Sequence, residues 1–195
     1  ETEIDSQEHE DAELLEKAKS RFSECADFYS KEYERGQEHL DFLLGQQWDE
    51  ADQAQRKLDG RPCLTENRLL PFAHQVINDI RQARPAINVI PVDNEADQET
   101  AKIMRGMVRN IEVQSSADNV YDTGAWNAIA SGYGWLRVNT RFVDENSFDQ
   151  ELELIRVPDF KSVMIDPMTK TMDGSDAEFG FVFEDIDREK FEDMY

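Results

Sequence analysis

The sequence predicts an α+β fold in which helices come first and antiparallel strands follow. Up to residue 131, apolar residues recur every three or four positions, which is the period of a helix that packs on one side. From residue 136 onwards they alternate with polar residues, which is the period of a half-buried strand. The chain has 195 residues, of which 39% are hydrophobic, and this is enough to bury a core.

A long helix is predicted from about Asp11 to Leu44. Gly36 marks a position where it could be interrupted, and Gly45 ends it. The next residues, Gln46 to Gly60, are predicted to form a polar loop that contains Trp48. The apolar stripe of the helix consists of Leu14, Leu15, Ala18, Phe22, Cys25, Phe28, Tyr29 and Tyr33. A helix with a single apolar stripe must pack on the same domain or on a neighbour.

A second helix is predicted to begin at Asn67, a favourable N-cap, and to run to about Ala83. Pro85 stops it, and Ile87 to Val92 then form a short strand. The apolar stripe of this helix consists of Leu69, Phe72, Ala73, Val76, Ile77 and Ile80.

Two further helices complete the helical part. The first is capped by Asp93 or Asn94, and the second runs from about Asp118 to Ser131 and stops at Gly132. The buried face expected for the first of these helices consists of Ile103, Met104, Met107, Val108 and Ile111.

The strands begin with a hairpin that has one buried face. Its first strand carries Leu136, Val138 and Phe142, and its second carries Leu152 and Leu154. The turn of the hairpin lies at 144–147. Two short strands follow, at 163–165 and 179–183, so the strands form an antiparallel meander. Asp187 is predicted to cap a last helix with a face of Phe191, Met194 and Tyr195.

We expect two parts in the chain. Residues 1–60 form a helical arm with the loop that contains Trp48, and residues 61–195 form an α+β domain. The last helix is cut off in the middle of its apolar pattern, which predicts that this domain is incomplete at its C-terminus.

The net charge of −22 is unevenly distributed. Residues 1–60 carry 7 basic and 18 acidic side chains, residues 61–110 carry 7 and 6, and residues 111–195 carry 7 and 19. Tight binding to DNA requires clustered lysine and arginine, and a surface this acidic therefore argues against it. Contact with DNA that must slide past without adhering remains compatible with like charges.

Cysteine usage and hydropathy indicate a protein that folds in a reducing cytosol. Cys25 and Cys63 are far apart without metal-ligand spacing, so we interpret them as reduced thiols. No apolar run approaches the roughly 20 residues of a membrane span, and the acidic start does not resemble a signal peptide. We therefore expect no membrane partner.

The motifs that could carry chemistry have structural explanations. The glycines of Gly132-Tyr133-Gly134 follow a helix and precede a strand, the reverse of a phosphate-binding loop, so we predict a turn. The acidic residues around Asp166, Asp173, Asp176 and Glu178 lack the alternating oxygen ligands of a calcium loop and indicate a solvated loop. We predict no catalytic, cofactor-binding or metal-binding residue, and no cofactor.

Histidines do not change this prediction. His9, His39 and His74 are widely separated and lie in helical segments. His74 lies beside an apolar stripe and is expected to be a packing residue, because none of the three has the spacing of a metal site.

Arginines form the one local concentration of positive charge. They are Arg61, Arg68, Arg81, Arg84, Arg105 and Arg109. One interpretation is that they form intramolecular ion pairs with the acidic surface. The other is that Arg68, Arg81, Arg84, Arg105 and Arg109 contact carboxylates of a neighbouring subunit, because a ring requires two different patches on each copy.

Several segments together resemble the portal proteins of short-tailed bacteriophages. They are Gly45-Gln46-Gln47-Trp48-Asp49, the run from Gly60-Arg61-Pro62 to Asn67-Arg68 and Pro71-Phe72, Val76 to Gln82, and Arg84 to Val89. The turn at 132–134 and the Asp166-Pro167 step follow in the expected order. The resemblance covers roughly Phe28 to Tyr195.

This resemblance implies the wing region of a subunit in a ring, typically of twelve copies, at one capsid vertex. Such rings bind the terminase large subunit, capsid or scaffold proteins and tail or head-completion proteins, and double-stranded DNA passes through them without sequence-specific binding. The implied location is the virion, after assembly in the host cytoplasm. The family contributes no catalytic residues.

Two other functions stay open from the sequence. The chain could be a free-standing acidic interaction domain that mimics DNA with its carboxylates. It could also be a metal-dependent hydrolase that uses the acidic loop, which would require a tightly bound divalent ion.

Overall fold

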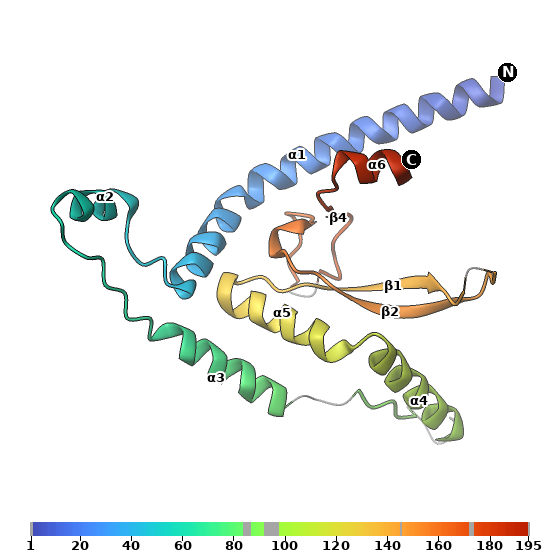
Figure 1. The fold of residues 1–195 in the computed structure, drawn as a ribbon. Helices are drawn as coiled ribbons and strands as arrows, with labels where there is room; N and C mark the ends of the chain where they lie inside the picture. The colour runs from blue at the N-terminus through green and yellow to red at the C-terminus, as the bar shows by residue number, and fades with distance from the viewer. Residues whose placement is uncertain (1, 84–86, 92–97, 145, 172–173, 195) are drawn as a thin grey trace. The chain divides into compact units, whose positions relative to one another are not determined.

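The α+β class is confirmed by the computed structural model, which describes residues 2–83, 87–91, 98–144, 146–171 and 174–194. Helices make up most of these residues (Figure 1). The four strands of the described residues do not form one meander, because they are divided between two separate two-stranded antiparallel sheets.

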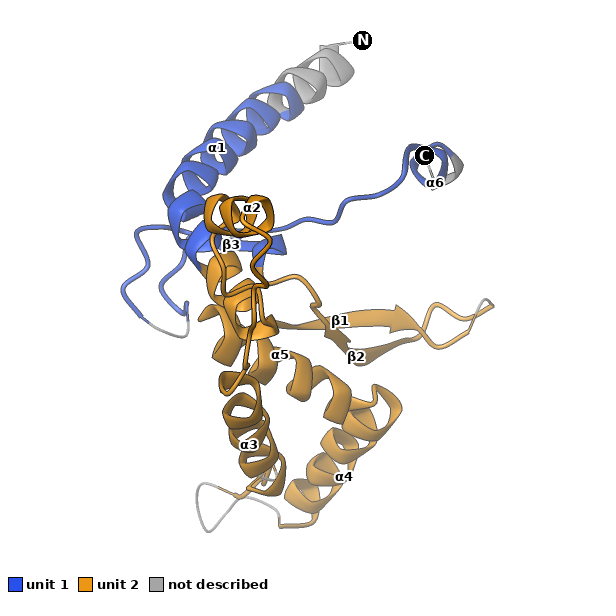
Figure 2. Ribbon diagram, turned by 60° about the vertical axis from the view of Figure 1, so that its left-hand side comes forward, with its two compact units in different colours: residues 1–35, 161–195 blue, residues 36–160 orange. Residues whose placement is uncertain are grey.

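The chain forms two compact units (Figure 2). Unit 1 combines residues 1–35 with 161–195, and unit 2 comprises residues 36–160. The division at residue 60 that the sequence suggests remains a prediction about the domains of the protein.

The first helix, α1 (Thr2–Leu44), continues through Gly36 without a break. A Cβ atom at this position would lie 3.0 Å from Cε2 of the Phe160 ring and 3.0 Å from the backbone oxygen of Ser131. Glycine therefore serves close packing here and does not interrupt the helix.

Gly45 ends α1, as predicted. Its φ of +109° places it in the left-handed region, where glycine has no Cβ to clash. The backbone N–H of Gln46 donates to Asp41 O over 2.9 Å, and that of Gly45 donates to Phe42 O over 3.2 Å. These two bonds are the Schellman pattern that closes a helix.

Unit 1 is held together by part of the apolar stripe of α1 and by the strands β3 (Val163–Ile165) and β4 (Gly180–Val182). Leu14, Leu15 and Phe28, which were predicted in the same stripe, are more than half exposed. Cys25 is fully buried, and the Tyr33 hydroxyl donates to the backbone oxygen of Val163. The Phe22 ring meets the rings of Phe181 and Phe183 edge to face, with centroids 5.4 and 5.7 Å apart. The last helix, α6 (Arg188–Met194), follows Asp187 as predicted. Tyr195 lies outside the described residues.

The predicted polar loop at 46–60 contains a helix, α2 (Glu50–Leu58), so this prediction was wrong. Asp49 caps it, since its carboxylate accepts the N–H of Ala51 over 2.7 Å. Acidic residues occupy its first turn, and Arg56 and Lys57 occupy its last turn. Both sets of charges interact favourably with the helix dipole. None of its residues is buried. The helix therefore lacks the packed apolar stripe on which the other helices were predicted.

Asn67 prepares the start of α3 (Leu69–Gln82), as predicted. Its side-chain oxygen accepts the N–H groups of Leu69 and Leu70, both over 3.2 Å, while its amide donates to Leu43 O over 2.6 Å. This one side chain therefore caps a helix and ties it to the end of α1.

A strand was predicted at 87–92, but residues 87–91, the part of it that the structure describes, do not form one. These residues are in neither a helix nor a strand, and Val92 lies outside the described residues together with Arg84, Pro85, Asp93 and Asn94. β-branched residues favour a strand only when a partner strand pairs with them.

The next two helices, α4 (Gln98–Gln114) and α5 (Ala117–Ser131), agree with the predicted segments. Gly132 stops α5 with a φ of +92°, and its N–H donates to Ala128 O. The buried face predicted for α4 was wrong: within this helix only Ala101 is buried, whereas Ile103, Met104 and Met107 are more than half exposed.

The predicted hairpin is formed by β1 (Leu136–Phe142) and β2 (Gln150–Arg156), with Val138 opposite Leu154. Helices α4 and α5 contact the hairpin mainly through β2, and the N–H of Leu154 donates to Ser115 Oγ over 2.9 Å. The expectation of a buried apolar face was wrong, because Leu136, Val138, Phe142 and Leu152 are each about half exposed. The helices cover the hairpin only in part: Glu153, Leu154 and Ile155 are half-buried, whereas these four apolar side chains stay open.

Candidate functional site

Exposed apolar stripes in unit 2 are the first candidate for a functional surface. They lie on α3, α4 and the hairpin, and consist of Leu69, Phe72, Val76, Ile80, Ile103, Met104, Met107, Leu136, Val138, Phe142 and Leu152. Large exposed apolar patches typically mark interaction sites, so each stripe is a candidate for one. A surface for assembly fits these residues better than a catalytic cleft does.

Of the five arginines predicted to contact a neighbouring subunit, the four that the structure describes have different surroundings. Arg68 pairs with Glu66 over 2.8 Å, and Arg105 donates to the backbone oxygen of Val89 over 2.8 Å. Arg109 is exposed and has no ion pair with any residue that the structure describes. Arg84 lies outside the described residues.

Arg81 connects α3 to α5. Its Nε lies 2.9 Å from Oδ2 of Asp122, which is a partner that spacing along the sequence did not suggest. Half of the Arg81 side chain is exposed, so this pair contributes roughly 0.5 kcal/mol at most. The pair orients the two helices more than it stabilises them.

A hollow of about 280 Å³ lies beside this pair, between α3, α5 and the end of β2. The ring of His74 stacks on Trp126 with centroids 5.4 Å apart, and Arg156 lines the same hollow. His74 is therefore a packing residue, as expected, although it is exposed and not buried.

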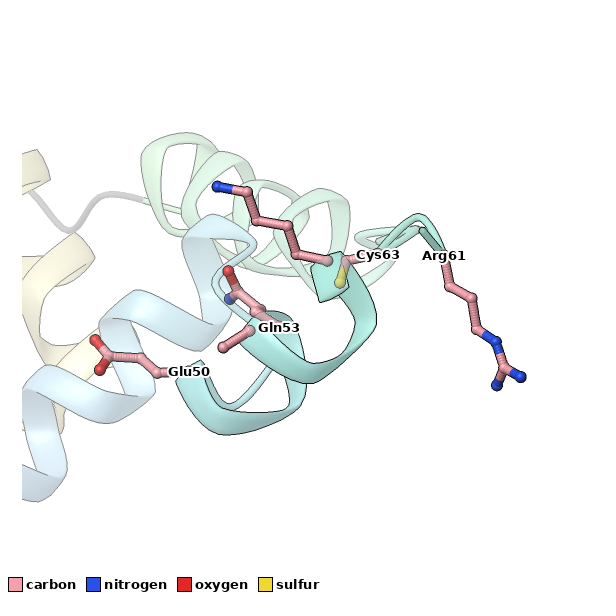
Figure 3. Close-up of a pocket in the computed structure, with 6 residues that line it drawn as sticks. Glu50, Gln53, Arg61 and Cys63 are labelled. Carbon is pink, nitrogen blue, oxygen red and sulfur yellow. The ribbon is translucent and has the colours of Figure 1, made fainter. Parts of the chain in front are cut away.

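The loop that contains Trp48 is held by its own side chains. The Trp48 indole donates to Leu64 O over 3.3 Å, and the guanidinium of Arg56 lies 4.3 Å from the centre of the Trp48 ring. A shallow hollow beside α2 is lined by Glu50, Gln53, Ala54, Lys57, Arg61 and Cys63. Glu50 and Gln53 project from α2 whereas Arg61 extends away from them, so these polar groups do not converge on a ligand (Figure 3).

The acidic loop is structural, and one part of its prediction was wrong: Asp166 is buried, not solvated. Its Oδ1 accepts the N–H of Met168 over 2.9 Å, and its Oδ2 accepts that of Glu178 over 3.3 Å. Asp173 lies outside the described residues. The carboxylate of Asp166 thus holds both ends of the loop.

Asp176 holds the middle of the same loop. It accepts the Thr171 hydroxyl over 2.6 Å, the Lys170 N–H over 2.8 Å and the Thr171 N–H over 3.3 Å. These bonds, with that of the hydroxyl first, lower the pKa of Asp176 below that of an ordinary aspartate.

A pH dependence follows from this lowered pKa. Because the folded pKa lies below the unfolded one, the carboxylate stabilises the loop fully above the unfolded pKa, near 4, and this stabilisation is lost as the pH falls through the folded pKa. We expect Asp176→Asn to expose the loop to proteolysis at pH 7 and to differ little from the wild type below the folded pKa. Limited proteolysis at neutral pH and NMR of the Thr171 amide over the acidic range measure this. Asp185→Asn, at an exposed position, is the control.

The glycines at 132–134 form a structural turn, as predicted. Gly134 lies against the backbone of Gly124 in α5, and a Cβ there would be only 1.9 Å from the Gly124 oxygen. The second glycine therefore permits close packing of a helix on the start of β1.

Metal-binding clusters and membrane-spanning helices are both absent from the described residues. No group of three or more His, Cys, Asp or Glu side chains in this part of the chain is placed to hold a metal ion. None of the described helices is long and apolar enough to cross a membrane.

Comparison with known proteins identifies similar sequences. The model of a family described as phage P22-like portal proteins matches residues 19–195. A curated relative described as a portal protein, from Acyrthosiphon pisum secondary endosymbiont phage 1, is 26% identical over 163 residues. The match covers 77% of this chain and 22% of the relative, so the chain spans about a fifth of the length of that protein.

Proposed function

Because the chain belongs to the phage P22-like portal protein family, we propose that it forms part of a ring at one capsid vertex, through which double-stranded DNA is packaged and ejected. The observation that carries this proposal is the family match over residues 19–195. The family is structural, and we assign no catalytic residue and no cofactor to the chain.

The charge of the chain supports a conduit that does not bind DNA tightly. A net charge of −22 repels the phosphate backbone at long range, so DNA can move past such a surface without adhering to it. The exposed apolar stripes of unit 2 also support assembly, because exposed apolar surface favours contact with a partner.

The partners follow from this role. We propose that the chain assembles with copies of itself, typically twelve, and that the ring binds the terminase large subunit, capsid or scaffold proteins, and tail or head-completion proteins. Its place is the virion, after assembly in the host cytoplasm. Residues 1–60 would be the arm and residues 61–195 the wing-like domain of each subunit.

Electron microscopy of the full-length protein tests the proposal. We expect ring-shaped particles with a central hole. A full-length protein that stays monomeric at high concentration and turns over a substrate would contradict it.

The arginines provide a test of the contact between subunits. We propose that Arg68, Arg81, Arg84, Arg105 and Arg109 meet carboxylates of a neighbour in the ring. We expect Arg109→Glu, or Arg81→Glu combined with Arg84→Glu, to weaken assembly while the fold survives, as measured by light scattering of the full-length protein. Arg109 is the sharper position, since no described residue pairs with it.

A charge swap is the control for Arg81. The variant Arg81→Glu/Asp122→Arg restores the ion pair within the chain, so it separates an intramolecular role from an intersubunit one. If the swap restores assembly, Arg81 acts only within its own subunit. If all the charge reversals assemble like the wild type, the arginine patch is not an interface.

A further inference from the structure

The hairpin of unit 2 has two outer edges. The outer edge of β2 is held at Leu154 by Ser115, whereas in the part of the chain that the structure describes the outer edge of β1 is open. Antiparallel pairing alternates along a strand, so that the backbone groups of successive residues point to opposite edges. The N–H of Val143 donates to Asp149 O, which places Arg137, Asn139 and Arg141 in the bonded pairs with β2. The backbone groups of the residues between them therefore point away from β2.

The hydrogen bond of Leu154 confirms which residues of the hairpin point outwards. Its N–H points away from β1 and donates to Ser115 Oγ, so Leu154 and Val138 form a non-bonded pair. Val138, Thr140 and Phe142 consequently direct their N–H and C=O groups to the outer edge of β1. Within the described residues, β1 has β2 as its only neighbour strand, and all three residues are exposed.

A second segment of unit 2 resembles a strand but lacks a sheet to join. The segment 87–91, Ile87-Asn88-Val89-Ile90-Pro91, has the composition of a strand and has no strand partner among the described residues. Arg105 donates to the oxygen of Val89 and so holds one side of the segment against α4. In an extended chain, the backbone groups of Asn88 and Ile90 point to the other side.

We propose that segment 87–91 of one copy adds to the open edge of β1 in a neighbouring copy, and that this β-strand addition is a head-to-tail contact of the ring. Each copy carries both halves of the contact, and they are different patches, which is what a closed ring requires. Strand addition to an exposed edge satisfies backbone groups that would otherwise remain open to wrong pairing. The inference rests on the proposed ring and names a contact within it.

The charge of the two halves is compatible with this contact. Val138, Thr140 and Phe142 lie on the apolar face of the hairpin, whose charged side chain is Arg156 at the far end, opposite Leu136. The other charged side chains of the two strands, including Arg141 with Glu151 and Glu153, lie on the opposite face. The segment 87–91 has no charged residue. Ile87, which is about half exposed, would extend the apolar face of the hairpin.

Proline scanning of β1 in the full-length protein tests the contact. Thr140→Pro removes an N–H from the open edge and leaves the bonded pairs with β2 in place, as proline is tolerated on an edge strand. We expect it to require about tenfold more protein for half-maximal ring assembly, measured by sedimentation, because the edge loses hydrogen bonding to the neighbour. Asn139→Pro, which removes a bonded N–H, is the control for loss of the hairpin itself. Circular dichroism of dissociated subunits must show that Thr140→Pro keeps the wild-type fold.

Thiol cross-linking tests which copy supplies the strand. In a Cys63→Ser background, subunits with Thr140→Cys are mixed with subunits with Asn88→Cys and treated with a short bifunctional maleimide whose reach covers neighbouring register positions. We expect cross-linked pairs of different subunits in the rings. Rings without cross-links between the two kinds of subunit, or rings of Thr140→Pro that form like the wild type, would overturn the inference while leaving the ring intact. A wild-type protein that forms no ring would instead overturn the proposed function.

Discussion

Gly134→Ala is expected to lower the free energy of unfolding by about 3 kcal/mol or to prevent unit 2 from folding. The added Cβ would lie 1.9 Å from the oxygen and 2.9 Å from the carbonyl carbon of Gly124, and 3.0 Å from Cβ of Ala128. The nearest of these atoms belong to the backbone of α5, so relief requires the helix and the start of β1 to separate. Urea denaturation followed by circular dichroism measures the loss.

Gly106→Ala is the matched control. It adds the same methyl group inside α4, where no heavy atom lies within 4 Å of the new Cβ. It should stabilise the chain by about 0.5–1 kcal/mol, because alanine favours a helix over glycine. If both variants unfold at the same urea concentration, the close approach of Gly134 to Gly124 is not a constraint in the folded protein.

Asp166→Ala is the second substitution with a large expected effect, at about 3 kcal/mol of lost stability. The side chain is buried, and its two oxygens accept the N–H groups of Met168 and Glu178. Removing both acceptors leaves two backbone donors without partners, each at a cost of about 1–3 kcal/mol. Hydrogen exchange at these two amides should accelerate together with the fall in thermal stability.

Two variants separate the role of Asp166 from a general effect of charge. Asp166→Asn keeps one acceptor oxygen, so we expect about half of the loss. Asp185→Ala removes a carboxylate from an exposed position and should change the free energy of unfolding by less than about 0.5 kcal/mol. An equal loss in Asp166→Ala and Asp185→Ala would show that reduced net charge, not the loop, explains the effect.

The helices were predictable wherever local rules decide the outcome. The end of α1 at Gly45, the cap of α3 at Asn67 and the stop of α5 at Gly132 each depend on one residue and its immediate neighbours. The helix α2 was missed because the prediction depended on an apolar period, whereas α2 depends on its cap at Asp49 and on charges at its ends.

Burial was predictable only in part, even where the partner lies in the same compact unit. Cys25, Tyr29 and Tyr33 of the α1 stripe are buried in unit 1. Leu14, Leu15 and Phe28 of the same stripe are more than half exposed. The stripe of α4 has the same amphipathic pattern, yet Ile103 and Met107 remain exposed in unit 2. An apolar pattern states that a face favours burial, but it does not identify the partner, and that partner can be another subunit.

The candidate interface shows the same limit. The sequence reveals that arginines concentrate between residues 61 and 110, but not that Arg81 faces Asp122 across two helices or that Arg105 holds the Val89 oxygen. Those pairings connect residues 41 and 16 positions apart. Packing of the helices determines them.

By itself, the sequence determined the α+β class, most helix ends, the hairpin and the family resemblance, because these depend on periodicity, caps, turns and motifs within short segments. Only the tertiary structure decided that the strands form two sheets, that Asp166 is buried, that Gly134 lies against Gly124 and that β1 keeps an open edge. The physical reason is that these features arise from which distant backbone groups meet, and hydrophobic attraction carries no direction that would specify such partners in advance.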